Sequence, residues 1–449
     1  MKALVIAIVT SFFPTSDNPD AILGKWNTED NKGVVEIYKL DQKYFAKLIE
    51  LKEPYDKNGE KKNDSKNPNP KLKTRNLIGV LVFWNMEYSS INKRWENGIF
   101  YDPDMGHEAK GFISMIDNNT LKVKGYVGFE WISKSQIWKR KQYTLQMKNK
   151  NYWKEHYVIE LNAEEIEQGI LHTNFMSGGI NFELIFFEKS KDAPNILISE
   201  GSGGHAYVFA ELAYMMHLKG YNVFIMPQHG TATIKKLMQR HEDAIKHIAN
   251  KFNERIGVFA EGLGGYAVFY LALANGSMKS MALQNSPAIL TEDKFQESFS
   301  EGDGAGRRRK LILPFAKFLV KIFPRLPLPI SIYLNYQELI DPKKETHSIE
   351  THLVTNGYLC DPDFNKWNPL STIMSLVSTP LPNSLTKLKI PTMFIVPERG
   401  IYPSYEKDLF NRLPDIKKKI IEVDGSVFWM VSHPKEAANV ICDWFNETL

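Results

Sequence analysis

The chain has 449 residues, of which 43% are hydrophobic and 24% are charged. At roughly 100–200 residues per domain, this length suggests two or three domains of ordinary globular composition. The 56 Lys and Arg exceed the 52 Asp and Glu by four, too small an excess to predict a nucleic-acid partner, and we expect none. The two cysteines, Cys360 and Cys442, exclude a disulfide scaffold and a cysteine-based metal cluster, but the sequence leaves open whether they pair.

The first predicted element is an apolar run at the N-terminus. Lys2 precedes a run from Ala3 to Phe13, after which Pro14 ends the pattern. A charged start before an apolar core of about 7–15 residues is typical of a secretory signal, and the run is shorter than the ~20 residues that cross a bilayer. The alternative is a first β-strand. We expect residues 1–16 to be a signal segment and the protein to be exported, to the periplasm or the cell envelope.

Residues 22–140 are predicted to form many short β-strands. Alternating or β-rich stretches occur at 34–38, 44–48 and 121–127, with turn-forming Asp, Asn and Gly between them. Strands of this length and spacing predict a small barrel. Five tryptophans could line a ligand cavity in such a barrel or fill its core: Trp26, Trp84, Trp95, Trp131 and Trp138.

Several motifs in this region resemble the bacterial family known as domain of unknown function 2147. They are I-L-G-K-W (22–26), G-V-V-E-I-Y (33–38), K-E-P (52–54), N-P-N-P (67–70), Y-D-P (101–103) with Gly106, and L-K-V-K-G-Y (121–126). The resemblance covers nearly all of residues 22–140. It implies a lipocalin-like barrel, usually found in exported proteins, and it supplies no established activity and no catalytic residue.

From about residue 181 the pattern changes to apolar strands that alternate with helices. Strands are expected at 195–199, 221–226, 256–260, 279–283, 391–396 and 419–423. Short buried strands alternating with helices predict a mostly parallel sheet with helices on both faces. The stretch 291–386 interrupts this alternation, and we expect it to form a cap or lid.

The third of these strands ends in A-E-G-L-G-G (260–265) and leads into a helix. This is the frame of a nucleophile elbow, G-x-S-x-G between a strand and a helix. The segment E-G-S-G-G-H (200–205) resembles a Gly-rich oxyanion loop, and Q-H-G (228–230) resembles the R-G-H-G turn of many hydrolases. Together these motifs resemble the α/β-hydrolase fold over residues 182–449, lid included.

The catalytic triad of that family is not visible at its expected positions. The nucleophile position is Gly262, the resemblance places the acid at Gly400, and alignment on Gly425 and Phe428 places the histidine at Val427. A triad acts as a unit, so the joint loss indicates that the usual hydrolytic machinery is absent. No Walker loop, dinucleotide fingerprint or metal-ligand motif occurs, and we expect no cofactor and no metal.

Other side chains near the elbow remain candidates. Ser286 follows a strand and could contact a ligand at the rim of the sheet or simply begin a turn. Glu261 and His205 could meet over the elbow as an acid–base pair, or could both be structural. The predicted ligand-binding residues are Gly201, Ser202, Gly203, Gly204, His205, Glu261, Gly262, Leu263 and Ser286.

Three functions are compatible with these patterns. The first is an exported binding protein, with a barrel fused to a catalytically degenerate α/β-hydrolase module that holds a small apolar, acyl or ester-like ligand. The second is an esterase or lipase that uses non-standard residues. The third is an envelope interaction protein. For this third function, the basic, apolar segment 307–323 could contact a membrane surface or could be a cap helix over the sheet.

Overall fold

In the computed structural model the chain divides into two compact units, each described by itself. The first comprises residues 1–142 with 179–181, and the second comprises residues 143–178 with 182–449. The structure describes residues 18–126, 133–143, 147–201, 203–226, 233–286, 316–324, 326–330, 349–380, 384–400 and 403–449. The expected signal segment 1–16 lies outside these ranges. In the described ranges no helix is both long and apolar enough to cross a membrane.

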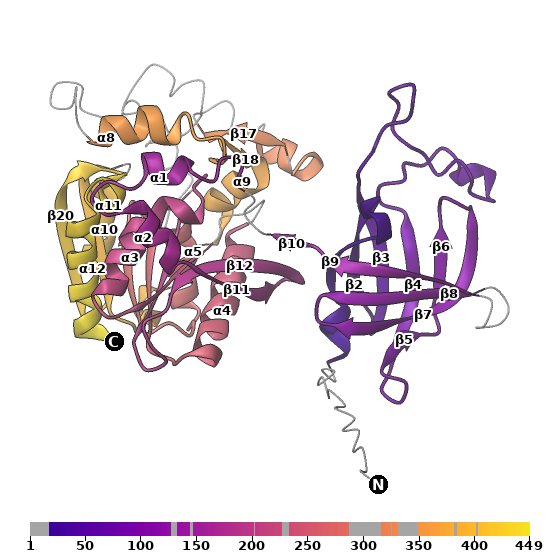
Figure 1. The fold of residues 1–449 in the computed structure, drawn as a ribbon, viewed down its shortest axis with the longest axis horizontal. Coiled ribbons are helices and arrows are strands. Elements are labelled where there is room, and N and C mark those ends of the chain that lie inside the picture. The colour runs from indigo at the N-terminus through magenta and orange to yellow at the C-terminus, as the bar shows by residue number, and fades with distance from the viewer. Residues whose placement is uncertain are drawn as a thin grey trace, which may run out of the picture. The chain divides into compact units, whose positions relative to one another are not determined.

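The first unit is an antiparallel β-barrel (Figure 1). Its strands are β1 (Gly24–Asn27), β2 (Gly33–Leu40), β3 (Lys43–Leu51), β4 (Leu81–Ser89), β5 (Arg94–Glu96), β6 (Ile99–Asp102), β7 (His107–Asp117), β8 (Thr120–Tyr126) and β9 (Ser133–Arg140). The sheet runs β3-β2-β1-β9-β8-β7-β5-β4-β6, and the additional pairing of β3 with β4 closes it. Closure leaves no long free edge, which explains why so many short strands are stable together.

Aromatic side chains fill the barrel. Trp26, Trp95 and Trp138 are at most 5% exposed and belong to one apolar cluster. The indole N–H of Trp26 donates to the Ile22 carbonyl oxygen at 2.9 Å, so its polar atom is satisfied inside the core. These three tryptophans therefore fill the core, whereas Trp131 lies outside the described residues.

The second unit contains a mostly parallel sheet. Its strands are β10 (Gln142–Tyr143), β11 (Leu171–Ser177), β12 (Ile180–Phe187), β13 (Asn195–Ser199), β14 (Asn222–Ile225), β15 (Ile256–Glu261), β16 (Ser280–Gln284), β19 (Thr392–Arg399) and β20 (Lys418–Ser426). The order is β12-β14-β13-β15-β16-β19-β20, with β11 beside β12. β12 is antiparallel to β14, and the pairs from β14 to β20 are parallel. This strand order is that of the α/β-hydrolase fold.

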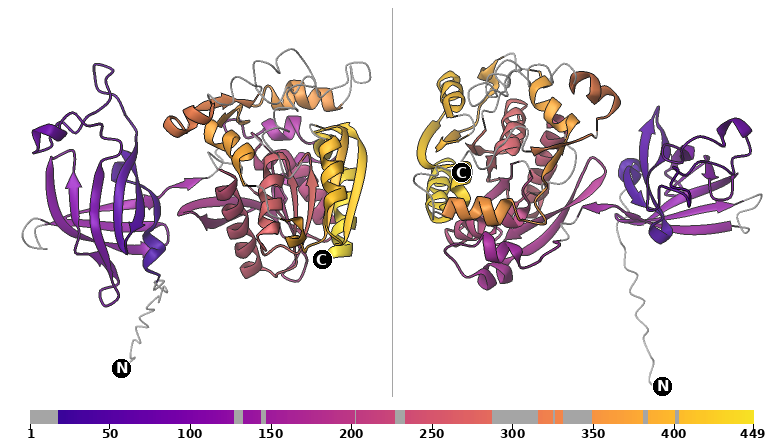
Figure 2. Two further views of the ribbon diagram at one scale, coloured as in Figure 1. Left: turned by 180° about the vertical axis from the view of Figure 1, so that it is seen from behind. Right: turned by 90° about the horizontal axis from the view of Figure 1, so that it is seen from above.

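Helices cover both faces of this sheet (Figure 2). They are α1 (Tyr152–His156), α2 (Ala163–Gly169), α3 (Ala210–Leu218), α4 (Ile234–Lys251), α5 (Gly262–Leu273), α10 (Pro403–Arg412), α11 (Trp429–Ser432) and α12 (Pro434–Thr448). α3 packs against α12 and α4 against α5, and the two pairs contribute to two separate apolar clusters. Burial on both faces explains why the strands are continuous apolar runs.

The described part of the predicted cap lies between β16 and β19. It contains a helical segment at 316–322, β17 (Pro327–Pro329), α8 (Ile349–His352), a π-helical turn (Leu353–Tyr358), β18 (Trp367–Pro369) and α9 (Leu370–Ser378). Apolar residues of α9 pack with Leu263 and Tyr266 of α5. The cap is thus joined to the helix that begins at the elbow.

Candidate functional site

The sharp turn between β15 and α5 has the geometry of a nucleophile elbow. Gly262, the first residue of α5, has φ +50°, a left-handed conformation that glycine adopts without strain. Of the described residues, a Cβ atom at this position would meet Gly201 alone, with the Gly201 Cα at 3.3 Å. The turn keeps the conformation that presents a nucleophile in a hydrolase, but its residue carries no reactive side chain.

Two amide side chains lie at Gly400 and Val427, the positions at which the sequence resemblance places the acid and the histidine. Gln284 and Asn285 both donate from their NH₂ groups to the Val427 carbonyl oxygen, at 3.3 and 3.2 Å. A Cβ atom at Gly400 would lie 2.9 Å from the Asn285 Oδ1, so the space beside Gly400 is occupied. The Asn285 amide thus lies between the position predicted for the acid and the position predicted for the histidine.

Ser286 lies at the elbow, as expected from its position after β16. Its hydroxyl donates to the carbonyl oxygens of Gly262 and Gln284, at 3.1 and 3.0 Å. Its backbone N–H donates to the Glu406 Oε1 at 2.7 Å. The hydroxyl proton is held by backbone oxygens, and no histidine among the described residues bonds to it, so these contacts fix the turn.

Of the two alternatives for Glu261 and His205, an acid–base pair or separate structural roles, the described contacts agree with the second. Glu261 accepts a hydrogen bond from the Gly201 amide, and a Cβ atom at Gly201 would lie 1.9 Å from the Glu261 Oε2. His205 instead places its Nε2 2.8 Å from the Asp361 Oδ2. The two side chains have different partners because Glu261 packs into the glycine loop, while His205 faces the cap.

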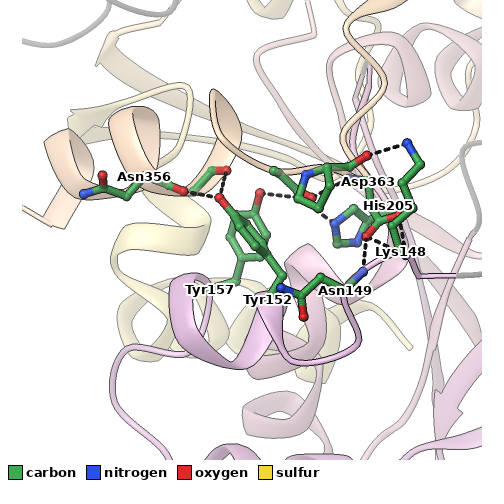
Figure 3. Close-up of polar contacts among 10 residues, drawn as sticks. Lys148, Asn149, Tyr152, Tyr157, His205, Asn356 and Asp363 are labelled. Atoms are coloured by element: carbon green, nitrogen blue, oxygen red, sulfur yellow. Dashed lines mark hydrogen bonds and ion pairs between the residues drawn. The ribbon is translucent and has the colours of Figure 1, made fainter.

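His205 belongs to a buried network that joins three segments distant in sequence (Figure 3). Asp361 receives hydrogen bonds from the Tyr157 hydroxyl at 2.7 Å and from the Asp363 N–H at 2.7 Å, in addition to His205. Burial opposes ionisation of Asp361, but the hydrogen bonds from His205 and Tyr157 outweigh it and lower the pKa of this carboxyl. The network ties the cap to the segment before the sheet.

Two neighbouring contacts reinforce this junction. The Tyr152 hydroxyl donates to the Asn356 and Gly357 carbonyl oxygens of the π-helical turn. The Lys148 N–H donates to the Asp363 carboxylate at 2.9 Å, also drawn in Figure 3. Sequence reasoning missed Tyr157 and Asp361, which are 204 positions apart and belong to no motif.

Three carboxyls near the elbow have raised pKa values: Glu200 and Glu406 are fully buried, and Glu261 is partly buried. Burial raises the pKa of Glu261 to about 8, partly offset by the Gly201 amide. Burial, with a smaller contribution from the charge of Glu261, raises the pKa of Glu406 to about 8 and that of Glu200 well above its usual range. Sequence reasoning also missed Glu406. Its position three residues before Leu409, on the buried face of α10, was the available signal.

The remaining predicted ligand-binding residues line the loop or the adjoining core. Gly203 accepts a backbone hydrogen bond from Asn365 of the cap at 2.8 Å, and a Cβ atom at Gly204 would lie 2.9 Å from the Glu200 Oε2. Leu263 is 7% exposed and packs in the cluster shared by α5 and the cap. Ser202 lies outside the described residues. Within the described ranges, no group of three His, Cys, Asp or Glu could hold a metal ion.

The fold and the elbow define a two-domain protein in which a lipocalin-like barrel precedes an α/β-hydrolase-fold domain. Residues 24–140 match the model of a family described as an uncharacterized protein conserved in bacteria, DUF2147. The resemblance recognised in the sequence is thereby confirmed for the barrel. No curated protein matches the chain.

Solved structures resemble one or the other domain. A monoacylglycerol lipase from Paleococcus ferrophilus is 16% identical with a TM-score of 0.43, over 62% of this chain and 98% of its own. A soluble variant of the Saccharomyces cerevisiae monoglyceride lipase is 13% identical with a TM-score of 0.49, over 65% and 98%. A Helicobacter pylori protein of the lipocalin family is 22% identical with a TM-score of 0.23, over 32% and 95%.

Proposed function

We propose that the α/β-hydrolase-fold domain is a non-catalytic binding module for a small apolar or acyl ligand. The observation that carries this proposal is the joint replacement of the triad by Gly262, Gly400 and Val427 within an otherwise complete fold. Nucleophilic catalysis needs a nucleophile, a base within hydrogen-bond reach and a group that orients the base. Two hydrogen atoms and an isopropyl group supply none of these.

The glycine loop supports the same proposal. In a hydrolase, N–H groups of this loop face a developing oxyanion. Here the Gly201 N–H already donates to the Glu261 carboxylate. A loop amide that is satisfied within the protein is not available to stabilise charge on a substrate. The elbow therefore keeps the framework of a hydrolase while its polar groups serve other partners.

Covalent labelling tests the absence of an activated nucleophile. A fluorophosphonate probe is expected to leave the wild-type chain unmodified, and Gly262→Ser is expected to remain unmodified because base and acid are still absent. Weak turnover of activated esters would not decide the question, because a site without its triad can retain roughly 10³–10⁴-fold catalysis. Stoichiometric labelling of the wild type, mapped to Ser286 or another serine, would overturn the proposal and favour the esterase or lipase alternative.

Calorimetry tests the binding half of the proposal. Methyl decanoate, a neutral acyl ligand, is expected to bind the full chain and to be recovered intact by mass spectrometry. Failure to bind this ester, octanol or decanoic acid at any accessible concentration would contradict an apolar or acyl site.

A second candidate function, contact with a membrane surface, is favoured by one observation in the cap. Several large apolar side chains there are more than half exposed: Phe318, Ile322, Phe323 and Trp367. Phe318 and Ile322 are four positions apart on the segment 316–322, which also carries Lys317 and Lys321. Exposed apolar side chains beside lysines suit a surface that contains anionic lipids. The part of the predicted segment from 307 to 315 lies outside the described residues.

Vesicle co-sedimentation tests this second function. The full chain is expected to sediment with phosphatidylglycerol vesicles more than with phosphatidylcholine vesicles, and the double variant Phe318→Ser with Ile322→Ser is expected to lose this. Ile91→Ser is a matched control, because Ile91 is 91% exposed but lies in the barrel. Equal sedimentation of the wild type and the cap variant would argue against the cap as the contact.

A further inference from the structure

Two buried side chains beside the elbow carry acceptor oxygens that have no partner among the described residues. Glu406 is fully buried, and its Oε1 accepts from the Ser286 N–H at 2.7 Å, but within the described ranges its Oε2 has no hydrogen-bond partner. Asn285 is 1% exposed, and its Oδ1 also has none. Buried polar groups in native proteins are almost always hydrogen-bonded, so each exception calls for an explanation.

Ser286 brings Glu406 to the elbow. The serine binds the Glu406 carboxylate through its N–H and the Gly262 carbonyl oxygen through its hydroxyl, at 3.1 Å. Ser286 alone therefore links the Glu406 carboxyl to Gly262 in the turn. Glu261 directly precedes Gly262 in the sequence. Glu261 at the end of β15 and Glu406 on α10 thus place two carboxyls next to the turn at Gly262.

Asn285 lies beside Gly400, the position at which the sequence resemblance places the acid. Its NH₂ group donates to the Val427 carbonyl oxygen at 3.2 Å, which turns the Oδ1 the other way. The Oδ1 lies 2.9 Å from the point where a side chain at Gly400 would begin. Asn285 directly precedes Ser286, whose N–H binds Glu406, so the amide oxygen is a third acceptor group next to the two carboxyls.

The polarity of this site is the reverse of that in a hydrolase. A hydrolase presents N–H donors to an oxygen that becomes negative. This elbow presents carboxyl and amide oxygens, and in the described ranges neither Glu261 nor Glu406 has an ion-pair partner from Lys, Arg or His. Once ionised, carboxylates beside an amide oxygen are complementary to a ligand that brings hydrogen-bond donors and positive charge.

We propose that Glu261, Glu406 and Asn285 bind the ammonium head of a primary amine whose remaining part is apolar. This inference rests on the proposed binding function and adds a head group to its ligand. A primary ammonium is compact and has three N–H donors, one for each of the three acceptor groups. A quaternary ammonium has no donor, and a metal ion does not suit the site because no group of three metal-ligating side chains occurs in the described ranges.

The charge balance of binding follows from the carboxyls. At neutral pH the raised pKa values of Glu261 and Glu406 keep these groups largely protonated in the free protein. The arriving ammonium keeps its own proton, and a carboxyl releases one proton to solvent as it becomes the counter-ion. Amine binding at neutral pH is therefore expected to release up to one proton per site.

Isothermal titration of the full chain with octylamine tests the inference. We expect octylamine to bind at least about 10-fold more tightly than octanol or octyltrimethylammonium, since a charge-assisted hydrogen bond contributes about 1.5–3 kcal/mol. Titrations in phosphate and in MOPS, which differ in ionisation enthalpy and contain no primary amine, report the released proton. Glu406→Gln and Glu261→Gln are each expected to weaken octylamine binding about 10- to 100-fold and to weaken octanol binding much less.

Glu398→Gln is the matched control, because Glu398 is exposed on the neighbouring strand β19 and is expected to leave octylamine binding unaltered. Gln has nearly the shape of a protonated Glu, and circular dichroism checks that both test variants fold. Octylamine and octanol binding equally, with no effect of either substitution, would refute the ammonium site and leave the apolar function standing. Octylamine binding without octanol or methyl decanoate binding would support the ammonium site and refute the apolar function. Absence of octylamine binding would overturn the inference.

Discussion

The barrel and the hydrolase-fold domain each bury a carboxyl completely, but they treat it in opposite ways. Asp64 of the barrel accepts hydrogen bonds from the Tyr101 hydroxyl at 2.6 Å, from Asn67 at 2.8 Å and from Arg75 at 2.9 Å. Burial opposes its ionisation, yet these bonds lower its pKa. Glu406 receives one backbone hydrogen bond, and its pKa is raised.

The difference distinguishes a carboxyl whose hydrogen bonds stabilise the fold from a carboxyl that can still bind a ligand. A carboxyl with three donors is fixed in charge and position, so a structural role accounts for it. A carboxyl that keeps a free oxygen in the interior lowers stability unless something else uses it. Arg140 is a second buried charged group of the barrel whose polar atoms have partners. Its guanidinium donates to the carbonyl oxygens of Ala21, Leu23 and Asn118.

The largest effect is expected from breaking the paired site. Asp64→Ala leaves the buried Tyr101 hydroxyl and Asn67 amide without their acceptor, and we expect it to destabilise the barrel by about 3–5 kcal/mol. Hydrogen-exchange mass spectrometry of peptides from residues 22–140 measures this change. Glu108→Ala, an exposed acidic position on β7, is expected to leave exchange unaltered. Equal protection in the two variants would contradict the distinction between the two carboxyls.

An effect of opposite sign is expected at the unpaired site. The pKa of Glu406 is about 8 in the folded state and 4.5 in the unfolded chain, so the folded state retains a proton that the unfolded state releases. The stability that this group contributes is complete below about pH 4.5 and is lost as pH rises through about 8. Glu406→Gln should therefore stabilise the domain by roughly 3 kcal/mol near pH 9 and by much less near pH 5.

Urea unfolding followed by helical circular dichroism measures this difference, because the helices belong to the hydrolase-fold domain. Glu398→Gln, which is exposed, provides the matched comparison. A wild type and a Glu406→Gln variant with parallel pH profiles would show that Glu406 ionises normally in the folded protein.

A smaller effect sharpens the comparison within the second domain. Tyr157→Phe removes one of the three donors to Asp361, and we expect a loss of about 1–2 kcal/mol because His205 and the Asp363 N–H remain. Tyr207→Phe is the control, since no hydrogen bond of its hydroxyl is seen in the described structure; its effect should stay within about 0.5 kcal/mol. Urea unfolding compares the free energies of unfolding of the two variants. Equal losses would show that the hydrogen bond from Tyr157 to Asp361 does not stabilise the domain.

Most of the fold follows from sequence patterns, whereas the polar partners at the site do not. Apolar runs such as 256–260 mark strands, because local hydrophobic patterning is a property of neighbouring residues. The elbow glycine was recognisable for the same reason. The partners of His205 and Ser286 were not, because Asp361 and Glu406 come from segments 156 and 120 positions away. Only tertiary packing decides such pairs.

The junction below the cap also has a consequence for where this domain can be cut. Tyr152, Trp153 and Tyr157 are buried in the same apolar cluster as the helices α3 and α12. A polypeptide that started at residue 182, where the strand-and-helix pattern becomes readable, would lack these aromatic side chains and leave Asp361 without the Tyr157 hydroxyl. The segment needed to fold the hydrolase-like domain is therefore longer than the stretch that carries its sequence motifs, and it begins upstream of Tyr152.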